Sequence, residues 1–186
     1  MSARPSHTGL IVGTIVAGAA LVIGTGALVA LGVSQTATPA TGAYGTITCS
    51  APTLPGTSVD VQVTDAGDSM MGQIPMRATL LATSVSVPAG KVSFVVANTG
   101  ALVHELVILP LPADGPGTRP TGSDGKIDES RSLGEASRSC DAGTGDGIAP
   151  GSTAWTTVTL QPGRYELVCD QPWHYAAGMF DVLTVT

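Results

Sequence analysis

Apolar and polar residues alternate in several short segments from residue 58 onward, which is the pattern of half-buried β-strands. In one of them Val59, Val61 and Val63 share a face. Turn signals such as Pro-Ala-Gly at 88–90 and Gln-Pro-Gly at 161–163 separate neighbouring segments. The predicted strands are Ser58–Asp65, Ala78–Val87, Lys91–Ala97, Leu102–Leu109, Thr153–Leu160, Arg164–Cys169 and Phe180–Thr186. Seven short strands of this kind predict an all-β domain, an antiparallel Greek-key β-sandwich or barrel.

Two parts of the chain lack this alternation. Residues 34–56 are rich in Thr, Ala, Pro and Gly and are predicted to form a flexible linker. Residues 110–151 are mostly Gly, Pro, Ser, Asp and Thr, and a loop of this length is either functional or poorly ordered. Within it, Ile127–Ala136 is a candidate for a short helical turn. The domain is therefore predicted over residues 57–186, with a long insertion at 110–151.

The N-terminal part carries a long apolar segment. Residues 9–33 contain no charged side chain, and as a helix they would span roughly 37 Å, more than the ~30 Å hydrocarbon core of a bilayer. Arg4, in the flank of residues 1–8, favours a cytoplasmic N-terminus. We therefore expect a single-pass anchor in the cell membrane and an extracytoplasmic C-terminal domain. A cleaved signal peptide is the alternative, although its apolar core is normally only ~7–15 residues long.

Composition and charge narrow the function further. Charged residues make up only 12% of the chain, which also contains 24 Gly and 13 Pro among its 186 residues. This composition suits a β-rich domain with many turns. The formal net charge is −6, and no stripe of Lys and Arg is present in the sequence. Because phosphate neutralisation needs clustered basic side chains, nucleic-acid binding is excluded.

Four residues with metal-binding side chains stand in a suggestive order. Cys169, His174 and Met179 lie within eleven residues of one another, and His104 lies upstream. The only other histidine, His7, precedes the apolar segment. One thiolate, two imidazoles and a thioether form the ligand set of a blue-copper centre, in which a His2Cys plane carries a weak axial Met. The pattern therefore predicts a mononuclear copper site.

From about residue 58 to residue 186 the chain resembles the cupredoxin superfamily of blue-copper proteins. Cys-x4-His-x4-Met and His-Tyr-Ala-Ala-Gly-Met are most similar to the sulfocyanin and rusticyanin branch, and Val-Pro-Ala-Gly-Lys-Val-Ser-Phe-Val-Val-Ala-Asn-Thr-Gly is similar to the segment before the first ligand. The resemblance implies a cupredoxin fold and one type 1 copper ion that cycles between Cu(I) and Cu(II). It also implies His104, Cys169 and His174 as equatorial ligands and Met179 as the axial ligand.

The sequence departs from the family pattern directly after the first ligand. In several cupredoxins an Asn follows the first His and braces the two ligand loops, whereas Glu105 stands there in this chain. Asn98 is the alternative candidate for holding the turn before His104.

Other readings of the same residues are weaker. Structural zinc prefers four Cys or His ligands, and a Cys–His nucleophile would need an oxyanion site that nothing in the sequence supplies. A copper enzyme would need further His ligands for a second copper ion, and none is available, so we expect no enzyme and no small-molecule substrate. The rival function is a copper carrier or storage protein, because thioethers hold Cu(I) and Met70, Met71 and Met76 form a cluster.

The predicted function is electron transfer between extracytoplasmic redox proteins, such as a cytochrome or an oxidase, which dock near His174. Trp173, Tyr175, Ala176, Ala177 and Phe180 would form an apolar docking ring, although Trp173 is expected to be exposed and Phe180 serves packing equally well. Outside the cytoplasm the two remaining thiols, Cys49 and Cys140, are expected to form a disulfide; the alternative is two unrelated thiols.

Overall fold

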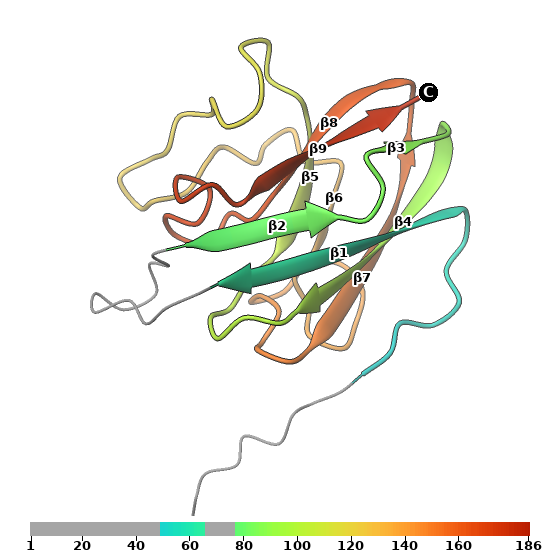
Figure 1. Cartoon of the computed structure of the whole chain (residues 1–186), viewed down its shortest axis with the longest axis horizontal. Coiled ribbons are helices and arrows are strands. Elements are labelled where there is room, and N and C mark those ends of the chain that lie inside the picture. The colour runs from blue at the N-terminus through green and yellow to red at the C-terminus, as the bar shows by residue number, and fades with distance from the viewer. Residues whose placement is uncertain (1–48, 66–76) are drawn as a thin grey trace, which may run out of the picture. The chain divides into compact units, whose positions relative to one another are not determined.

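The computed structural model describes residues 49–65 and 77–186 (Figure 1). The described residues form nine strands and contain no helix. The strands are β1 (Thr57–Asp65), β2 (Ala78–Ala82), β3 (Ser86–Val87), β4 (Gly90–Asn98), β5 (Leu106–Pro110), β6 (Gly134–Ala136), β7 (Thr153–Leu160), β8 (Gly163–Val168) and β9 (Phe180–Val185). The predicted all-β class is confirmed for this part of the chain.

The strands form two facing sheets. One has the order β2-β1-β4-β7 and the other the order β3-β9-β8-β5-β6, and the chain crosses repeatedly between them. The pairs β1–β4 and β3–β9 are parallel, while the other neighbouring pairs are antiparallel. The expectation of a purely antiparallel sandwich is therefore wrong for two pairs. In the first pair, the chain passes from β1 to β4 by way of β3 in the opposite sheet, which lets β1 and β4 run in the same direction.

Alternating side chains fill the space between the sheets. The three valines of β1 that the pattern places on one face are at most 2% exposed, and they face residues of the second sheet such as Leu167 and Leu183, which are fully buried. Burying one such side chain contributes about 1.5–3 kcal/mol. In β8, Tyr165 and Leu167 point into this core, as the alternation predicts. The same alternation places Cys169, which follows β8, in the core.

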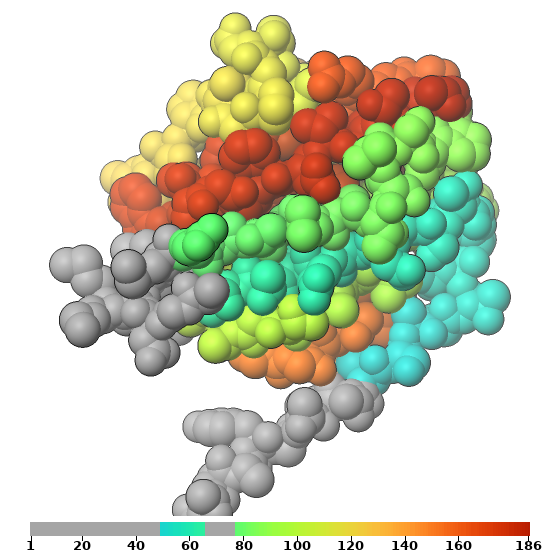
Figure 2. Space-filling view, in the orientation of Figure 1, coloured from blue at the N-terminus to red at the C-terminus, as the bar shows by residue number. Residues whose placement is uncertain are grey.

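The predicted strand Ala78–Val87 is two strands that belong to different sheets. Thr83 still donates its N–H to Asp60 of β1, whereas Val85 already accepts a hydrogen bond from Thr184 of β9. The chain therefore changes sheet within three residues, and Val85, at the crossing, is 67% exposed. The side chains of β2 lie next to those of β9 at this edge (Figure 2). Alternation alone does not reveal the crossing, because both halves keep a buried face.

The insertion contains a strand where a helical turn was a candidate. No helix occurs in Ile127–Ala136; instead β6 pairs antiparallel with β5. A Cβ on Gly134 would lie 2.3 Å from a methyl carbon of Val158 in the opposite sheet. Glycine thus allows β6 to approach β7 closely, which a larger residue would prevent.

The part of the insertion that precedes β6 packs on the outer face of β5 and β8. Ile127 joins Val107, Leu109, Val168 and Tyr175 in a second apolar cluster, separate from the main core. A buried ion pair reinforces the contact: Arg119 Nε lies 2.6 Å from Glu166, a carboxylate that is fully buried. In Figure 2 the atoms of residues 110–125, in yellow, lie against the red atoms of the C-terminal strands. The insertion is therefore part of the folded domain.

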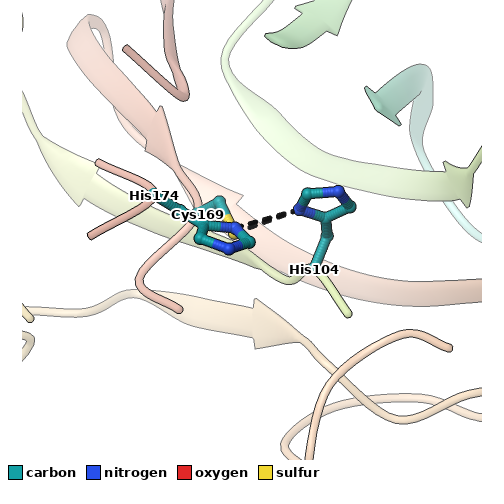
Figure 3. Close-up of side chains that lie close together, drawn as sticks. All are labelled: His104, Cys169 and His174. Atoms are coloured by element: carbon teal, nitrogen blue, oxygen red, sulfur yellow. Dashed lines mark hydrogen bonds between the residues drawn. The ribbon is translucent and has the colours of Figure 1, made fainter. Parts of the chain in front are cut away.

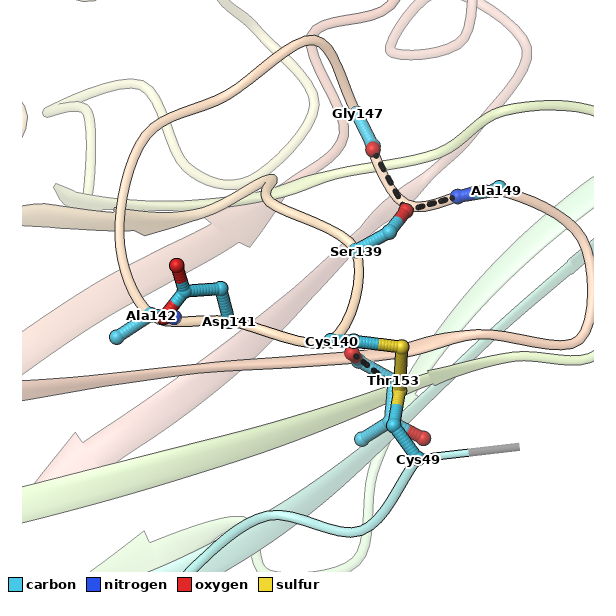
Figure 4. Close-up of a disulfide and its surroundings, with 8 residues drawn as sticks. All are labelled: Cys49, Ser139, Cys140, Asp141, Ala142, Gly147, Ala149 and Thr153. Atoms are coloured by element: carbon cyan, nitrogen blue, oxygen red, sulfur yellow. Dashed lines mark hydrogen bonds between the residues drawn. A yellow bond between two sulfur atoms is a disulfide. The ribbon is translucent and has the colours of Figure 1, made fainter. Parts of the chain in front are cut away.

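A disulfide joins Cys49 to Cys140 across 91 residues, which confirms the predicted pairing (Figure 4). Cys140 also donates its N–H to Thr153 at the start of β7. The disulfide attaches residues 49–56, part of the segment predicted as a linker, to the insertion. In the chain-entropy model a cross-link over so long a loop contributes about 4–5 kcal/mol.

Several predictions lie outside the described residues. These are the membrane anchor at 9–33, the flank at 1–8, the first part of the linker and the cluster of Met70, Met71 and Met76. In the part of the chain that is described, no helix has the length and apolarity needed to cross a bilayer.

Candidate metal centre

Three of the four predicted ligands meet at one end of the sandwich (Figure 3). Nδ1 of His104 and Nδ1 of His174 lie 3.1 Å apart. Cys169 Sγ lies 3.4 Å from Nδ1 of His174 and 3.8 Å from Nδ1 of His104. All three residues are at most 1% exposed. His104 lies 65 residues before Cys169 and 70 residues before His174, and the fold brings one donor atom of each around a common point.

His104 lies in the loop between β4 and β5, not in a strand. The predicted strand Leu102–Leu109 begins only at Leu106. His104 and Ile148 instead form an isolated bridge in which each N–H donates to the other's carbonyl, at 3.2 and 2.6 Å. Because Ile148 belongs to the insertion, the insertion fixes the backbone of the first ligand.

Asn98 holds the turn before His104, as its candidate role predicts. Its side-chain amide donates to the carbonyls of Leu102 and Ile148 at 2.8 and 2.7 Å, and its side-chain oxygen accepts from the N–H of Gly100. Asn98 is 1% exposed, so these hydrogen bonds lie away from water. One side chain therefore ties β4, the His104 loop and the insertion together.

Asp65, at the end of β1, is a residue of the site that the sequence reasoning missed. Its Oδ1 lies 2.9 Å from Nε2 of His104 and also accepts the N–H groups of Ala101 and Leu102. Burial raises the pKa of Asp65, but the hydrogen bonds from Leu102, His104 and Ala101 outweigh it, so the pKa is lowered overall. An ionised Asp65 accepts a hydrogen bond from the N–H at Nε2 of His104 and so keeps the proton on Nε2, which leaves Nδ1 as a lone-pair donor that faces the cysteine.

Burial lowers the pKa of His104, and the hydrogen bond to Asp65 only partly opposes this effect. A neutral imidazole is the form that binds a metal ion. The only sequence signal for Asp65 is its position at the end of a strand, and nothing there indicates a partner 39 residues away.

The other three predicted ligands come from one compact loop between β8 and β9. Cys169 donates its N–H to the carbonyl of Met179, and Met179 donates to the carbonyl of His174. Further short-range bonds, from His174 to Gln171 and from Gly178 to Tyr175, close consecutive turns. The loop is therefore held mainly by its own backbone.

Met179 is fully buried and belongs to the same core cluster as Cys169. Its backbone is hydrogen-bonded to that of Cys169 at 3.1 Å, so both side chains enter the core at the same end. This position is compatible with a weak fourth donor next to the three-residue plane.

The cysteine is a buried, free thiol. Burial raises its pKa well above the usual range for a thiol, and the nearby carboxyl of Glu105 raises it further. The backbone N–H of Glu105 points to Sγ at 3.4 Å, which favours a thiolate once a cation compensates the cost of burial. A metal ion at this site must therefore displace a proton from Cys169.

Glu105 replaces the bracing Asn of several cupredoxins and makes a brace of its own. Its Oε2 accepts a hydrogen bond of 2.9 Å from the side chain of Gln171, in the loop that carries Cys169. Burial raises the pKa of Glu105 to about 7. The contact between the two ligand segments is thus present, although a carboxyl group supplies it.

The donor atoms suit a metal ion of the first transition row. Bonds of about 2.0–2.1 Å to nitrogen and about 2.3 Å to sulfur hold three donors in a trigonal plane about 3.5–3.8 Å apart. The observed spacings of 3.1, 3.4 and 3.8 Å lie close to these values. A soft sulfur with two imidazoles and a thioether nearby is the chemistry that copper prefers, since both oxidation states are accommodated.

The model of the sulfocyanin (SoxE) domain family matches residues 78–186, more than half of the chain. The chain belongs to the sulfocyanin family. It is thus a cupredoxin-like blue-copper electron-transfer protein, and its cofactor is one type 1 copper ion. A comparison with curated protein sequences finds no match.

Solved structures of auracyanins and rusticyanins are among those similar to this chain. Reduced auracyanin from Roseiflexus castenholzii is 22% identical, with a TM-score of 0.44, and the alignment covers 70% of this chain and 98% of that one. Auracyanin B is 21% identical, with a TM-score of 0.45 and coverage of 73% and 93%. Rusticyanin from Thiobacillus ferrooxidans is 21% identical, with a TM-score of 0.43 and coverage of 71% and 79%. The family assignment rests on the sequence match and not on these likenesses.

Proposed function

We propose that this sulfocyanin is a membrane-anchored carrier of single electrons between extracytoplasmic redox proteins. In this proposal His104, Cys169 and His174 are the equatorial copper ligands and Met179 is the axial ligand. The observation that carries it is the buried cluster of one sulfur and two ring nitrogens within 4.8 Å of one another. The apolar segment at 9–33 supports the anchor and the side of the membrane.

When bound, the copper ion accepts and releases one electron. The chain's own residues would hold the donors in a geometry that suits both oxidation states, because hydrogen bonds of the fold fix both ligand segments. Asp65 orients His104, and the backbone bonds between Cys169 and Met179 fix the loop. Little has to move when the charge of the site changes, and this rigidity favours fast electron transfer. The buried surroundings exclude water, and together with an axial thioether they favour a fairly high potential.

The proposed docking surface is the exposed part of the ligand loop beside His174. His174 itself is 1% exposed, whereas Trp173 is 40% exposed, as expected, and Ala176 is also exposed. Tyr175 is buried and hydrogen-bonded to Glu166, so its predicted place in a docking ring is wrong. Phe180 is half-buried and packs against the ring of Tyr175. A small apolar patch of this kind suits a short-lived redox encounter that buries less than ~1,200 Å².

Two properties separate an electron carrier from the alternative, a copper carrier or storage protein. An electron carrier retains one copper ion per chain through many redox cycles. A copper carrier binds additional Cu(I) through Met70, Met71 and Met76 and passes metal to an acceptor.

The test is to count copper in the full-length protein before and after repeated reduction and reoxidation, with a Cu(I) chelator present. We expect one ion per chain throughout, and the same count in a variant with all three methionines changed to Leu. Loss of metal to the chelator on reduction, or a second ion that disappears in the triple variant, would support the copper carrier instead.

A further inference from the structure

Next to the copper site lies a second cluster of potential ligands that the electron-transfer function does not use. Carboxylate oxygens of Glu105, Glu129 and Asp170 lie within 4.8 Å of one another. Glu105 and Asp170 are 4% and 1% exposed, and Glu129 is half-buried. Each residue comes from a different segment: one follows His104, one follows Cys169, and Glu129 belongs to the insertion.

One oxygen of this cluster is buried without a partner. Glu105 Oε1 has no hydrogen bond in the part of the chain that the structure describes, while Oε2 of the same carboxyl accepts from Gln171. A buried polar atom left unsatisfied costs about 1–3 kcal/mol. Native proteins avoid such atoms, so the orphan oxygen points to a ligand that the cluster holds.

Other charged side chains lie near the cluster. Lys126 is the cation that acts on both buried carboxyls, and Glu135 adds further negative charge near Glu105. Asp170 Oδ1 accepts the N–H of Ile127 at 2.7 Å, which fixes the orientation of its carboxyl group. Three carboxyl groups thus lie close together, with the side chain of Lys126 near them.

We propose that Glu105, Glu129 and Asp170 bind a divalent cation with oxygen ligands, and that Ca²⁺ fits best. The three oxygens lie within 4.8 Å of one another, and Ca²⁺, which takes carboxylate oxygens at about 2.3–2.6 Å in a flexible geometry, can draw such a group together. Mg²⁺ demands shorter bonds of about 2.0–2.1 Å in a near-ideal octahedron and usually keeps several waters, so carboxylates fixed by the fold suit it less well. Carboxylate oxygens prefer a hard cation such as Ca²⁺, whereas the sulfur and nitrogen donors of the neighbouring site prefer copper. The two sites would therefore bind different ions.

A bound cation would connect the insertion to both segments that carry copper ligands. Glu105 adjoins His104, Asp170 adjoins Cys169, and Glu129 would hold the insertion against them. The insertion thereby gains a role, because it supplies the third carboxylate.

Equilibrium dialysis of the full-length, copper-loaded protein against radioactive calcium chloride tests this site. We expect one Ca²⁺ per chain with a Kd of about 1 mM or lower, the range of extracellular calcium modules. Glu129→Gln keeps the size of the side chain and should weaken binding at least about tenfold. The matched control is Asp128→Asn, which removes a neighbouring carboxylate that is fully exposed to solvent, and it should leave the Kd unchanged.

Three outcomes would overturn the calcium site: no binding up to about 10 mM, unchanged binding in Glu129→Gln, or an equal loss in Asp128→Asn. In the first case the carboxyl groups balance their charge with shared protons and hold no ion. The visible spectrum of each variant, recorded in parallel, shows whether the fold and the copper site are intact. A failure of the calcium site is thus distinguishable from a failure of the copper function.

Discussion

The two segments that carry the copper ligands are built in different ways. The loop from Cys169 to Met179 is closed by hydrogen bonds between residues that are no more than ten positions apart in sequence. The segment around His104 is held instead by Asp65, 39 residues before it, and by Ile148, 44 residues after it. The first segment is held mainly by its own backbone, whereas the second depends on distant parts of the fold.

This difference explains what a sequence can reveal about such a site. Residues that are joined by local hydrogen bonds stand a fixed number of positions apart in the sequence, so Cys-x4-His-x4-Met is recognisable on its own. Residues that come into contact from distant segments have no fixed separation in the sequence, so a short motif does not reveal them. We therefore expect substitutions in the loop to change the chemistry of the site, and substitutions around His104 to act through stability and affinity.

Cys169→Ser should have the largest effect. A hydroxyl group fits the space of the thiol but is a poor copper ligand, so the blue colour should disappear completely while the fold remains. Visible absorption and circular dichroism measure the two outcomes separately. Retained blue colour would contradict the role of this thiolate.

Asn98→Ala should destabilise the domain by about 2–3 kcal/mol, because the carbonyls of Leu102 and Ile148 each lose a donor and the N–H of Gly100 loses its acceptor. Chemical denaturation of the full-length protein measures the change. Gln62→Ala is the matched control: it removes an exposed amide that also makes one hydrogen bond, and the loss should stay within about 0.5 kcal/mol. Equal losses in the two variants would show that the His104 segment does not depend on Asn98.

Much of the fold could be predicted from the sequence, because alternation reports burial directly. The strands β1, β4, β7 and β8 begin and end within a residue or two of the predicted positions. The split between β2 and β3 and the strand β6 could not be predicted, since each depends on which sheet edge is free to pair. Asn98 was a candidate because of its place in a motif, whereas Asp65 lacked any local signal.

Asp65→Ala should weaken copper binding about 10- to 100-fold, the usual effect of removing a residue that orients a ligand. Competition with a chelator of known affinity measures the change. Asp60→Ala removes an exposed carboxylate of the same strand and should leave the affinity unchanged. If both variants bind copper as the wild type does, the orientation of His104 must come from its backbone bridge to Ile148 alone.

Met179→Leu should have the smallest effect on the fold, since the two side chains have similar volumes and the exchange costs less than about 1.5 kcal/mol. Copper should remain bound by the three equatorial donors, while the reduction potential shifts because the axial thioether is gone. Protein film voltammetry measures the shift. An unchanged potential would remove Met179 from the ligand set.

The visible absorption spectrum of the full-length protein, loaded with copper and oxidised, tests the coordination of the site most directly. We predict an intense blue colour from one copper ion per chain, which fades on reduction and returns on reoxidation. A protein that stays colourless and free of metal after incubation with a cupric salt and dialysis would contradict the copper centre altogether.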